Sequence, residues 1–122
     1  MAQRVHARPI IYLSGAMHGS KARPDDRDMA LETAKLYSRV LWLYVYAVFS
    51  PQCNTTHMYG SGLYSDPFLA FDLEFIREMA DAVLALPGWE HSDGACAEVD
   101  LARAIGLPIY TTLQEAYDAL PH

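Results

Sequence analysis

The chain has 122 residues, of which 52% are hydrophobic, and its formal net charge is -6. This length suits one domain, residues 1–122, and the apolar content excludes a disordered chain. The acidic charge argues against a nucleic-acid polymer as partner, because binding one requires clustered lysines and arginines, but small anionic ligands stay open. Because there are two cysteines and no secretory leader or long apolar span, we expect a cytoplasmic protein that binds no membrane.

The first half of the chain alternates predicted strands and helices. Residues 9–13 form a short apolar run typical of a buried strand, followed by a glycine-bearing loop over 14–20. Apolar residues recur every three or four positions from about 26 to 44, which predicts a helix. Residues 47–49 read as a second strand. We interpret 52–65, rich in Asn, Thr, Gly and Tyr, as a loop.

The second half continues the alternation. Asp66 and Pro67 are a cap residue followed by a proline, a typical helix start. The predicted elements are a helix over 66–79, a strand over 81–86, a helix capped by Ser92 or Asp93, a strand over 109–111 and a last helix with a capping box at Thr112 and Glu115. This order predicts a single-domain α/β fold, a flavodoxin/Rossmann-like three-layer sandwich with a mainly parallel sheet of four to five strands.

Two carboxylates fall on helix faces that should be buried. At about 100° per residue, Glu98 lies within an apolar arc and Asp72 lies at the centre of an apolar stripe. The arc comprises Ala95, Val99, Ala102, Ile105 and Gly106, and the stripe comprises Phe68, Phe75, Ile76 and Met79. An unpaired buried carboxylate is costly, so two of them near the expected ligand edge favour a nucleophile or base and a proton donor. Capping a loop or pairing with an arginine is the alternative for each.

Three stretches resemble the nucleoside 2-deoxyribosyltransferase-like superfamily. They are Tyr12-Leu13-Ser14-Gly15, the helix around Asp72-Leu73, and Ser92-Asp93-Gly94-Ala95-Cys96-Ala97-Glu98. The superfamily contains nucleoside 2-deoxyribosyltransferases, 2′-deoxynucleoside 5′-phosphate N-hydrolases and many small bacterial and phage proteins. The resemblance covers roughly residues 9–111 and is strongest to the small proteins, through residues 86–110.

The resemblance implies cleavage of the N-glycosidic bond of a nucleoside or (deoxy)nucleoside 5′-monophosphate. Glu98 would be the nucleophile that attacks the anomeric carbon, Asp72 the acid that assists departure of the base, and Tyr12 the residue that positions the nucleophile. The implied substrate-binding residues, which include the phosphate-holding loop of the hydrolases, are Ser14, Gly15, Ala16, Met17, His18, Gly19, Ser92 and Gly94.

The first glycine loop departs from the hydrolase pattern, which has a serine and an arginine where this chain has Ala16 and His18. The cation that the loop lacks could come from His18, Lys21 or Arg23. A hydrolase acting on a 5′-monophosphate is the first interpretation. A base-exchanging deoxyribosyltransferase and a non-catalytic nucleotide-binding module stay open. We expect no metal and no cofactor, because the histidines and cysteines form no tight ligand cluster.

The segment from Val40 to Tyr46 contains seven consecutive residues without a charge, Trp42 among them. One helix face and one short strand cannot obviously bury all of these side chains. An exposed apolar patch of this size favours a partner, so we expect a homodimer or a larger homo-oligomer with Trp42 near the interface. The alternative is that this run is the end of a core helix and a buried strand.

Overall fold

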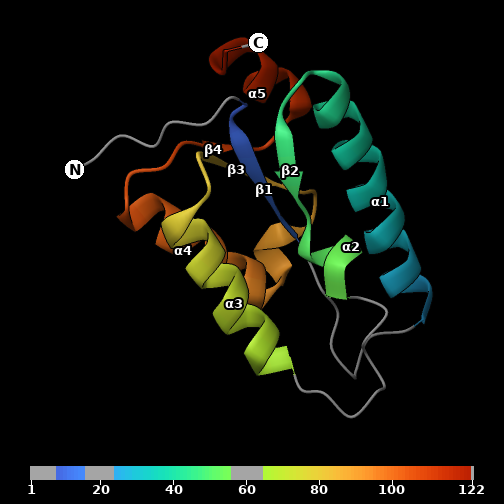
Figure 1. The fold of residues 1–122 in the computed structure, drawn as a ribbon. Coiled ribbons are helices and arrows are strands. Elements are labelled where there is room, and N and C mark those ends of the chain that lie inside the picture. Colours follow the sequence, from blue (N-terminus) through green and yellow to red (C-terminus); the bar gives the residue numbers. More distant parts are fainter. Residues whose placement is uncertain (1–7, 16–23, 56–64, 122) are drawn as a thin grey trace.

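The computed structural model describes residues 8–15, 24–55 and 65–121. Their elements follow one another along the chain in the order strand, helix, strand, two helices, strand, helix, strand, helix, with a short 3-10 helix before α4 (Figure 1). The bounds are β1 Ile10–Ser14, α1 Pro24–Leu43, β2 Ala47–Phe49, α2 Pro51–Thr55, α3 Ser65–Glu78, β3 Ala82–Ala85, η2 Trp89–His91, α4 Asp93–Ala104, β4 Ile109–Tyr110 and α5 Leu113–Ala119.

The four strands form one parallel sheet in the order β2-β1-β3-β4. The chain runs from β1 outward to β2 and then returns to the other side of β1 to form β3. The strand order therefore reverses between β1 and β3, where Ser14 is aligned with Ala85 at the carboxyl ends of both strands. In open α/β sheets, ligands bind in the crevice outside the carboxyl ends of the strands at this reversal. The topology thus places the candidate site between β1 and β3.

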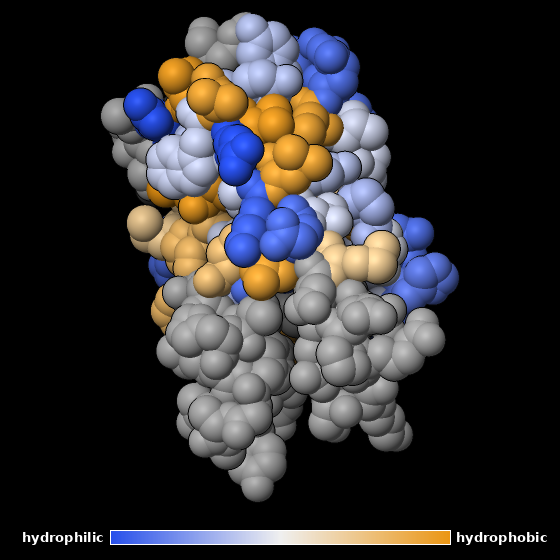
Figure 2. Space-filling view, turned by 90° about the vertical axis from the view of Figure 1, so that its right-hand side faces the viewer, coloured by the Kyte–Doolittle hydropathy of each residue, from blue (hydrophilic) through white to orange (hydrophobic). Residues whose placement is uncertain are grey.

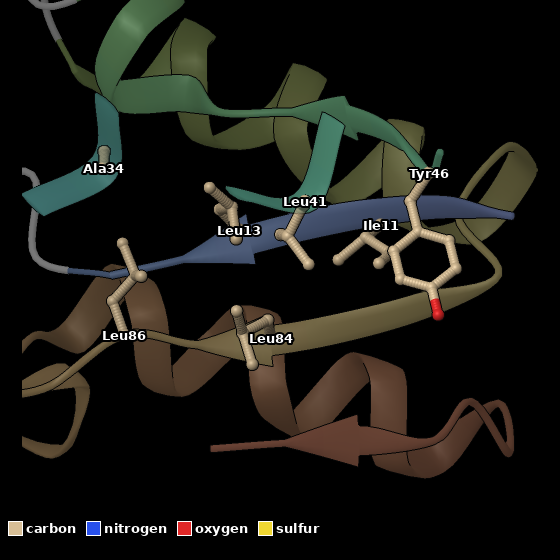
Figure 3. Packing of buried hydrophobic residues seen from close by; sticks show 7 residues of the cluster. All are labelled: Ile11, Leu13, Ala34, Leu41, Tyr46, Leu84 and Leu86. Atoms are coloured by element: carbon tan, nitrogen blue, oxygen red, sulfur yellow. The ribbon is translucent and has the colours of Figure 1, made fainter. Parts of the chain in front are cut away.

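Helices cover both faces of the sheet and make three layers (Figure 1). On one face α1 and α5 pack over a cluster of aliphatic side chains and Tyr46 (Figure 3). On the other face α3 and α4 pack over a second cluster that includes Tyr12, Ile76 and Val83. Because successive strand residues point to opposite faces, Ile11 and Leu13 belong to the first face, and Tyr12 and Ser14 to the second.

The predicted fold class is confirmed, a flavodoxin/Rossmann-like α/β sandwich whose four-stranded sheet is wholly parallel. The loop prediction for residues 52–65 is wrong at its beginning, where α2 occupies Pro51–Thr55. A proline is tolerated in a first helical turn, and the Ser50 hydroxyl accepts a hydrogen bond from the backbone N–H of Cys53 at 3.4 Å. Both features favour a helix that begins directly after the strand.

Two details of the predicted apolar helix faces are also corrected. Helix α4 ends at Ala104, so Ile105 and Gly106 lie beyond it, and Gly106 has the positive φ of 83° that favours glycine after a helix. Helix α3 ends at Glu78, and Met79, which follows it, is exposed rather than part of the buried stripe. The central members of both faces, including Ile76 and Val99, are buried as predicted.

Helix α3 begins at Ser65, so the predicted cap residue Asp66 lies inside it, but the cap predictions for α4 and α5 agree with the structure. Ser92, and not Asp93, caps α4, because its hydroxyl accepts a hydrogen bond from the backbone N–H of Ala95 at 3.2 Å. Thr112 caps α5 in the same way through the N–H of Glu115 at 3.0 Å. Among the helices of the described ranges, none has both the length and the apolar character that a membrane crossing requires.

Candidate functional site

Four polar side chains meet beneath the carboxyl ends of β1 and β3. Tyr12 and Ser14 come from β1, Glu98 from α4 and Asp72 from α3. All four are buried, with Glu98 5% and Asp72 2% exposed. Residues that lie 84 to 86 positions apart in the chain therefore touch through side-chain hydrogen bonds. The sequence prediction that both carboxylates face inward is confirmed.

The carboxylate of Glu98 is held by two hydroxyl groups. The Tyr12 hydroxyl donates a hydrogen bond to Oε2 at 2.5 Å, and the Ser14 hydroxyl donates one to Oε1 at 2.7 Å. Ser14 also lies 3.4 Å from the backbone oxygen of Ala95, one turn earlier on α4. Each carboxylate oxygen thus has its own donor, so the side chain is fixed in one orientation.

Asp72 is less well provided with hydrogen-bond donors than Glu98. Its Oδ1 is buried without a hydrogen-bond partner among the residues that the structure describes. Burial raises the pKa of Asp72 to about 7, and a contact with the Tyr12 hydroxyl opposes this rise. A protonated Asp72 is the form that such an environment favours near neutral pH.

Burial likewise raises the pKa of Glu98 to about 7. The hydrogen bonds from Tyr12 and Ser14 lower this pKa, and the nearby charge of Asp72 raises it. Two carboxylates that repel each other in this way do not both ionise easily. The pair therefore holds a proton near neutrality, and the geometry decides which member keeps it.

The available donors favour ionised Glu98 beside protonated Asp72. Tyr12 has one hydroxyl proton, which it donates in a hydrogen bond to Glu98 Oε2. Burial and the two carboxylates also raise the pKa of Tyr12 well above its usual value, so the hydroxyl keeps that proton. Glu98 has two donors, whereas Asp72 Oδ1 has none within the described part of the chain. This arrangement provides a nucleophile or base and an acid side by side.

The first turn of α4 lies next to this pair, since the backbone oxygen of Ala95 contacts Ser14. The Ser92 hydroxyl caps the helix, two residues before Gly94. A Cβ added at Gly94 would meet only ordinary contacts, at 3.9 Å from Ser92 Oγ and 4.0 Å from Leu69 Cδ1. Packing among the described residues therefore does not require this glycine, which lies at a helix start, a position where anions bind in other proteins.

Gly15 is required by packing, in contrast to Gly94. A Cβ at Gly15 would lie 2.9 Å from Leu86 Cδ1 and 3.0 Å from Gln52 Nε2. Of the predicted substrate-binding residues, Ser14, Gly15, Ser92 and Gly94 thus lie at the carboxyl edge. The other four, Ala16, Met17, His18 and Gly19, lie outside the described residues, as do Lys21 and Arg23.

Ser50 and Gln52 are buried polar residues that the sequence analysis did not select. The Ser50 hydroxyl donates to Gln52 Oε1 at 3.2 Å, and the other end of the amide lies beside Gly15. They follow β2 at the same carboxyl edge of the sheet. The sequence signal that could have identified them is the Ser-Pro pair directly after the strand, followed by the polar residue Gln52.

Among the residues that the structure describes, no group of three or more His, Cys, Asp or Glu side chains is placed to bind a metal ion. Trp89, in the 3-10 helix that precedes α4, is partly buried.

The predicted dimer residues Trp42, Leu43 and Val45 are exposed, while Leu41 and Tyr46 are in the core.

Comparison with known proteins identifies the family. The family model described as "Domain of unknown function (DUF4406)" matches residues 9–111, which contain all four residues of the buried cluster. No curated protein and no solved structure matches the chain. The description of this family names no activity.

Proposed function

The chain belongs to the DUF4406 family, and from the geometry of its buried carboxylate pair we propose that it cleaves N-glycosidic bonds. The substrate class is a nucleoside or (deoxy)nucleoside 5′-monophosphate, and water is the acceptor. Glu98 is the nucleophile, Asp72 is the acid and Tyr12 positions Glu98. The resemblance to the nucleoside 2-deoxyribosyltransferase-like superfamily supports the same assignment.

One observation carries this proposal. Glu98 is buried at the switch point of the sheet with each oxygen bound by a hydroxyl, while Oδ1 of the neighbouring Asp72 has no donor among the described residues. Cleavage of an N-glycosidic bond develops positive charge on the sugar, which an ionised carboxylate stabilises or traps. The departing base needs a proton, which a carboxyl group with a raised pKa supplies. The two buried carboxylates match these two needs.

The reaction proceeds in two steps. In the first, a Glu98 oxygen bonds to the anomeric carbon, the bond from that carbon to the base nitrogen breaks, and the Asp72 proton goes to the base. In the second, Asp72 takes a proton from water, the water oxygen bonds to the anomeric carbon, and Glu98 is released. Tyr12 and Ser14 keep the Glu98 carboxylate aimed throughout, which lowers the entropic part of the barrier.

In this proposal the 5′-phosphate binds at the first turn of α4. Helix starts bind anions, Ser92 caps this one, and Gly94 adds no side chain there. According to the resemblance, the glycine loop that follows β1 supplies the remaining donors. The sugar would then lie between the phosphate and Glu98, which is four residues after Gly94 on α4.

The test is a panel of deoxynucleosides and their 5′-monophosphates, with release of the base followed by chromatography. We expect release from monophosphates by the wild-type chain, and a loss of about a thousandfold or more in Glu98→Gln. Asp100→Asn, an exposed carboxylate two residues along the same helix, is the matched control and should retain full activity.

Each other outcome selects a different function. Release from nucleosides alone would remove the phosphate assignment, and exchange that needs a second base would make the protein a transferase. Nucleotide binding without release by either the wild type or Glu98→Gln would identify a non-catalytic binding module. The absence of any thermal shift with every nucleotide would contradict the whole proposal.

A further inference from the structure

Hydrophobic side chains are exposed along the outer face of α1. Met29, Leu36 and Leu43 are 70%, 57% and 73% exposed. They are seven residues apart, so they lie in one row along the helix, which we call the α1 stripe. At 1.5 Å per residue the stripe is about 21 Å long. Water is a poor environment for three large apolar side chains in a row.

The same face of the molecule is seen in Figure 2, because α1 forms the right-hand side of Figure 1. Hydrophobic residues gather over its upper part and are interrupted by a few hydrophilic ones. Trp42 and Val45, which are also exposed, extend the hydrophobic surface at the carboxyl end of α1. The stripe is therefore one part of a larger apolar surface.

Val45 adds an independent sign that this surface is used. It is 46% exposed and has a φ of 68°, the left-handed conformation that a β-branched residue rarely adopts. Glycine is the usual residue at such a turn after a helix. A valine here pays for its backbone conformation and for its exposed side chain, and a partner that covers the side chain offsets the second cost.

Two charges beside the stripe indicate which partner fits. Glu32 and Arg39 lie on one side of it, seven residues apart. Glu32 contacts Lys35 of its own helix at 3.4 Å, whereas Arg39 has no ion pair within the described part of the chain. When two copies of such a helix pack antiparallel, flanking residues of this kind face their own counterparts across the interface. Glu32 of each copy then lies near the partner's Arg39.

We propose that the protein forms a homodimer in which two α1 helices pack antiparallel about a two-fold axis near Leu36. The α1 stripe of each copy covers that of the other, and two Glu32–Arg39 ion pairs flank it. A parallel pairing loses this complementarity, because Glu32 would then face the uncharged Tyr37 region. The net charge of -6 disfavours an anionic membrane surface as the occupant of this face.

The mass of the full chain in solution tests the dimer. Light scattering across micromolar concentrations should give twice the chain mass of 13.6 kDa. Leu36→Glu, at the centre of the interface, should raise the dimer dissociation constant at least about a hundredfold. Met79→Glu, which changes an exposed apolar residue away from α1, is the matched control and should leave the dimer intact. A monomeric wild type overturns the proposal.

Charge reversal tests the antiparallel arrangement itself. Glu32→Arg and Arg39→Glu should each weaken self-association about tenfold, because like charges then meet twice in each dimer. A mixture of the two variants should recover wild-type affinity, since both ion pairs re-form in the mixed dimer. Failure of the mixture to recover, with both variants folded by circular dichroism, contradicts the antiparallel pairing. Neither result depends on the enzymatic activity.

Discussion

The two faces of the sheet each bury a tyrosine, but the two tyrosines have different roles. Each face contains a fully buried tyrosine, Tyr46 under α1 and α5, and Tyr12 under α3 and α4. The Tyr46 hydroxyl donates to the backbone oxygen of Leu120 at 3.2 Å, which only satisfies a buried polar group. The Tyr12 hydroxyl donates to a buried carboxylate. The same residue type thus stabilises the fold on one face and orients a reactive group on the other.

The two faces also differ in the energetic cost of the groups that they bury. The buried side chains of the first face are aliphatic apart from Tyr46 and contain no charge (Figure 3). The second face holds two carboxylates whose burial raises their pKa values. A face kept only for stability would not contain them, because removing a carboxylate from water is costly.

Leu13→Ala should have the largest effect on stability and leave the chemistry unchanged. Leu13 is fully buried in the aliphatic face, so truncating it creates a cavity and lowers the free energy of unfolding by about 3 kcal/mol. Urea denaturation measures this loss. A pH profile of activity that shifts in this variant would contradict the separation of the two faces.

Tyr12→Phe should lower kcat/KM about a hundredfold, because Glu98 loses the donor on Oε2. The lost hydrogen bond lowered the Glu98 pKa, so that pKa rises and the acidic limb of the pH profile moves to higher pH. Tyr46→Phe removes a hydroxyl from the other face and is the matched control. Equal losses in the two variants would argue against a positioning role for Tyr12.

Asp72→Asn should make the protein more stable at pH 8, by about 2 kcal/mol. The wild-type pKa is raised to about 7 on folding, so the contribution of Asp72 is favourable below about pH 4 and is lost as the pH rises through 7. The gain from the amide therefore shrinks between pH 8 and pH 5. Unfolding at both pH values, with exposed Asp100→Asn as control, checks the sign.

Val45→Gly should have the smallest effect, a gain of about 1 kcal/mol in the free energy of unfolding of the monomer. The gain comes from relief of the positive φ in the turn after α1. The same change should weaken the dimer, because it removes an exposed apolar side chain beside the α1 stripe. Denaturation of the variant in a Leu36→Glu background separates the two effects.

The sequence by itself determined the fold class and the inward direction of both carboxylates. Local periodicity and caps are set by neighbours within a few residues, which is why the alternation of elements and a cap at Ser92 or Asp93 could be predicted. The prediction from the sequence missed α2 and extended the buried faces of α3 and α4 past the ends of these helices. A short helix and a helix end are set by single capping contacts, which the periodicity does not reveal.

Only the tertiary structure decided which polar groups meet. Nothing in the local pattern around Tyr12 or Ser14 assigns one hydroxyl to each oxygen of Glu98, because these contacts join strand and helix across 84 to 86 residues. The lack of a donor for Asp72 Oδ1 among the described residues and the closeness of Gln52 to Gly15 also depend on how the elements pack. Side-chain periodicity fixes the direction of a residue, but the strand order fixes its neighbours, and the division of roles between the two carboxylates follows from those neighbours.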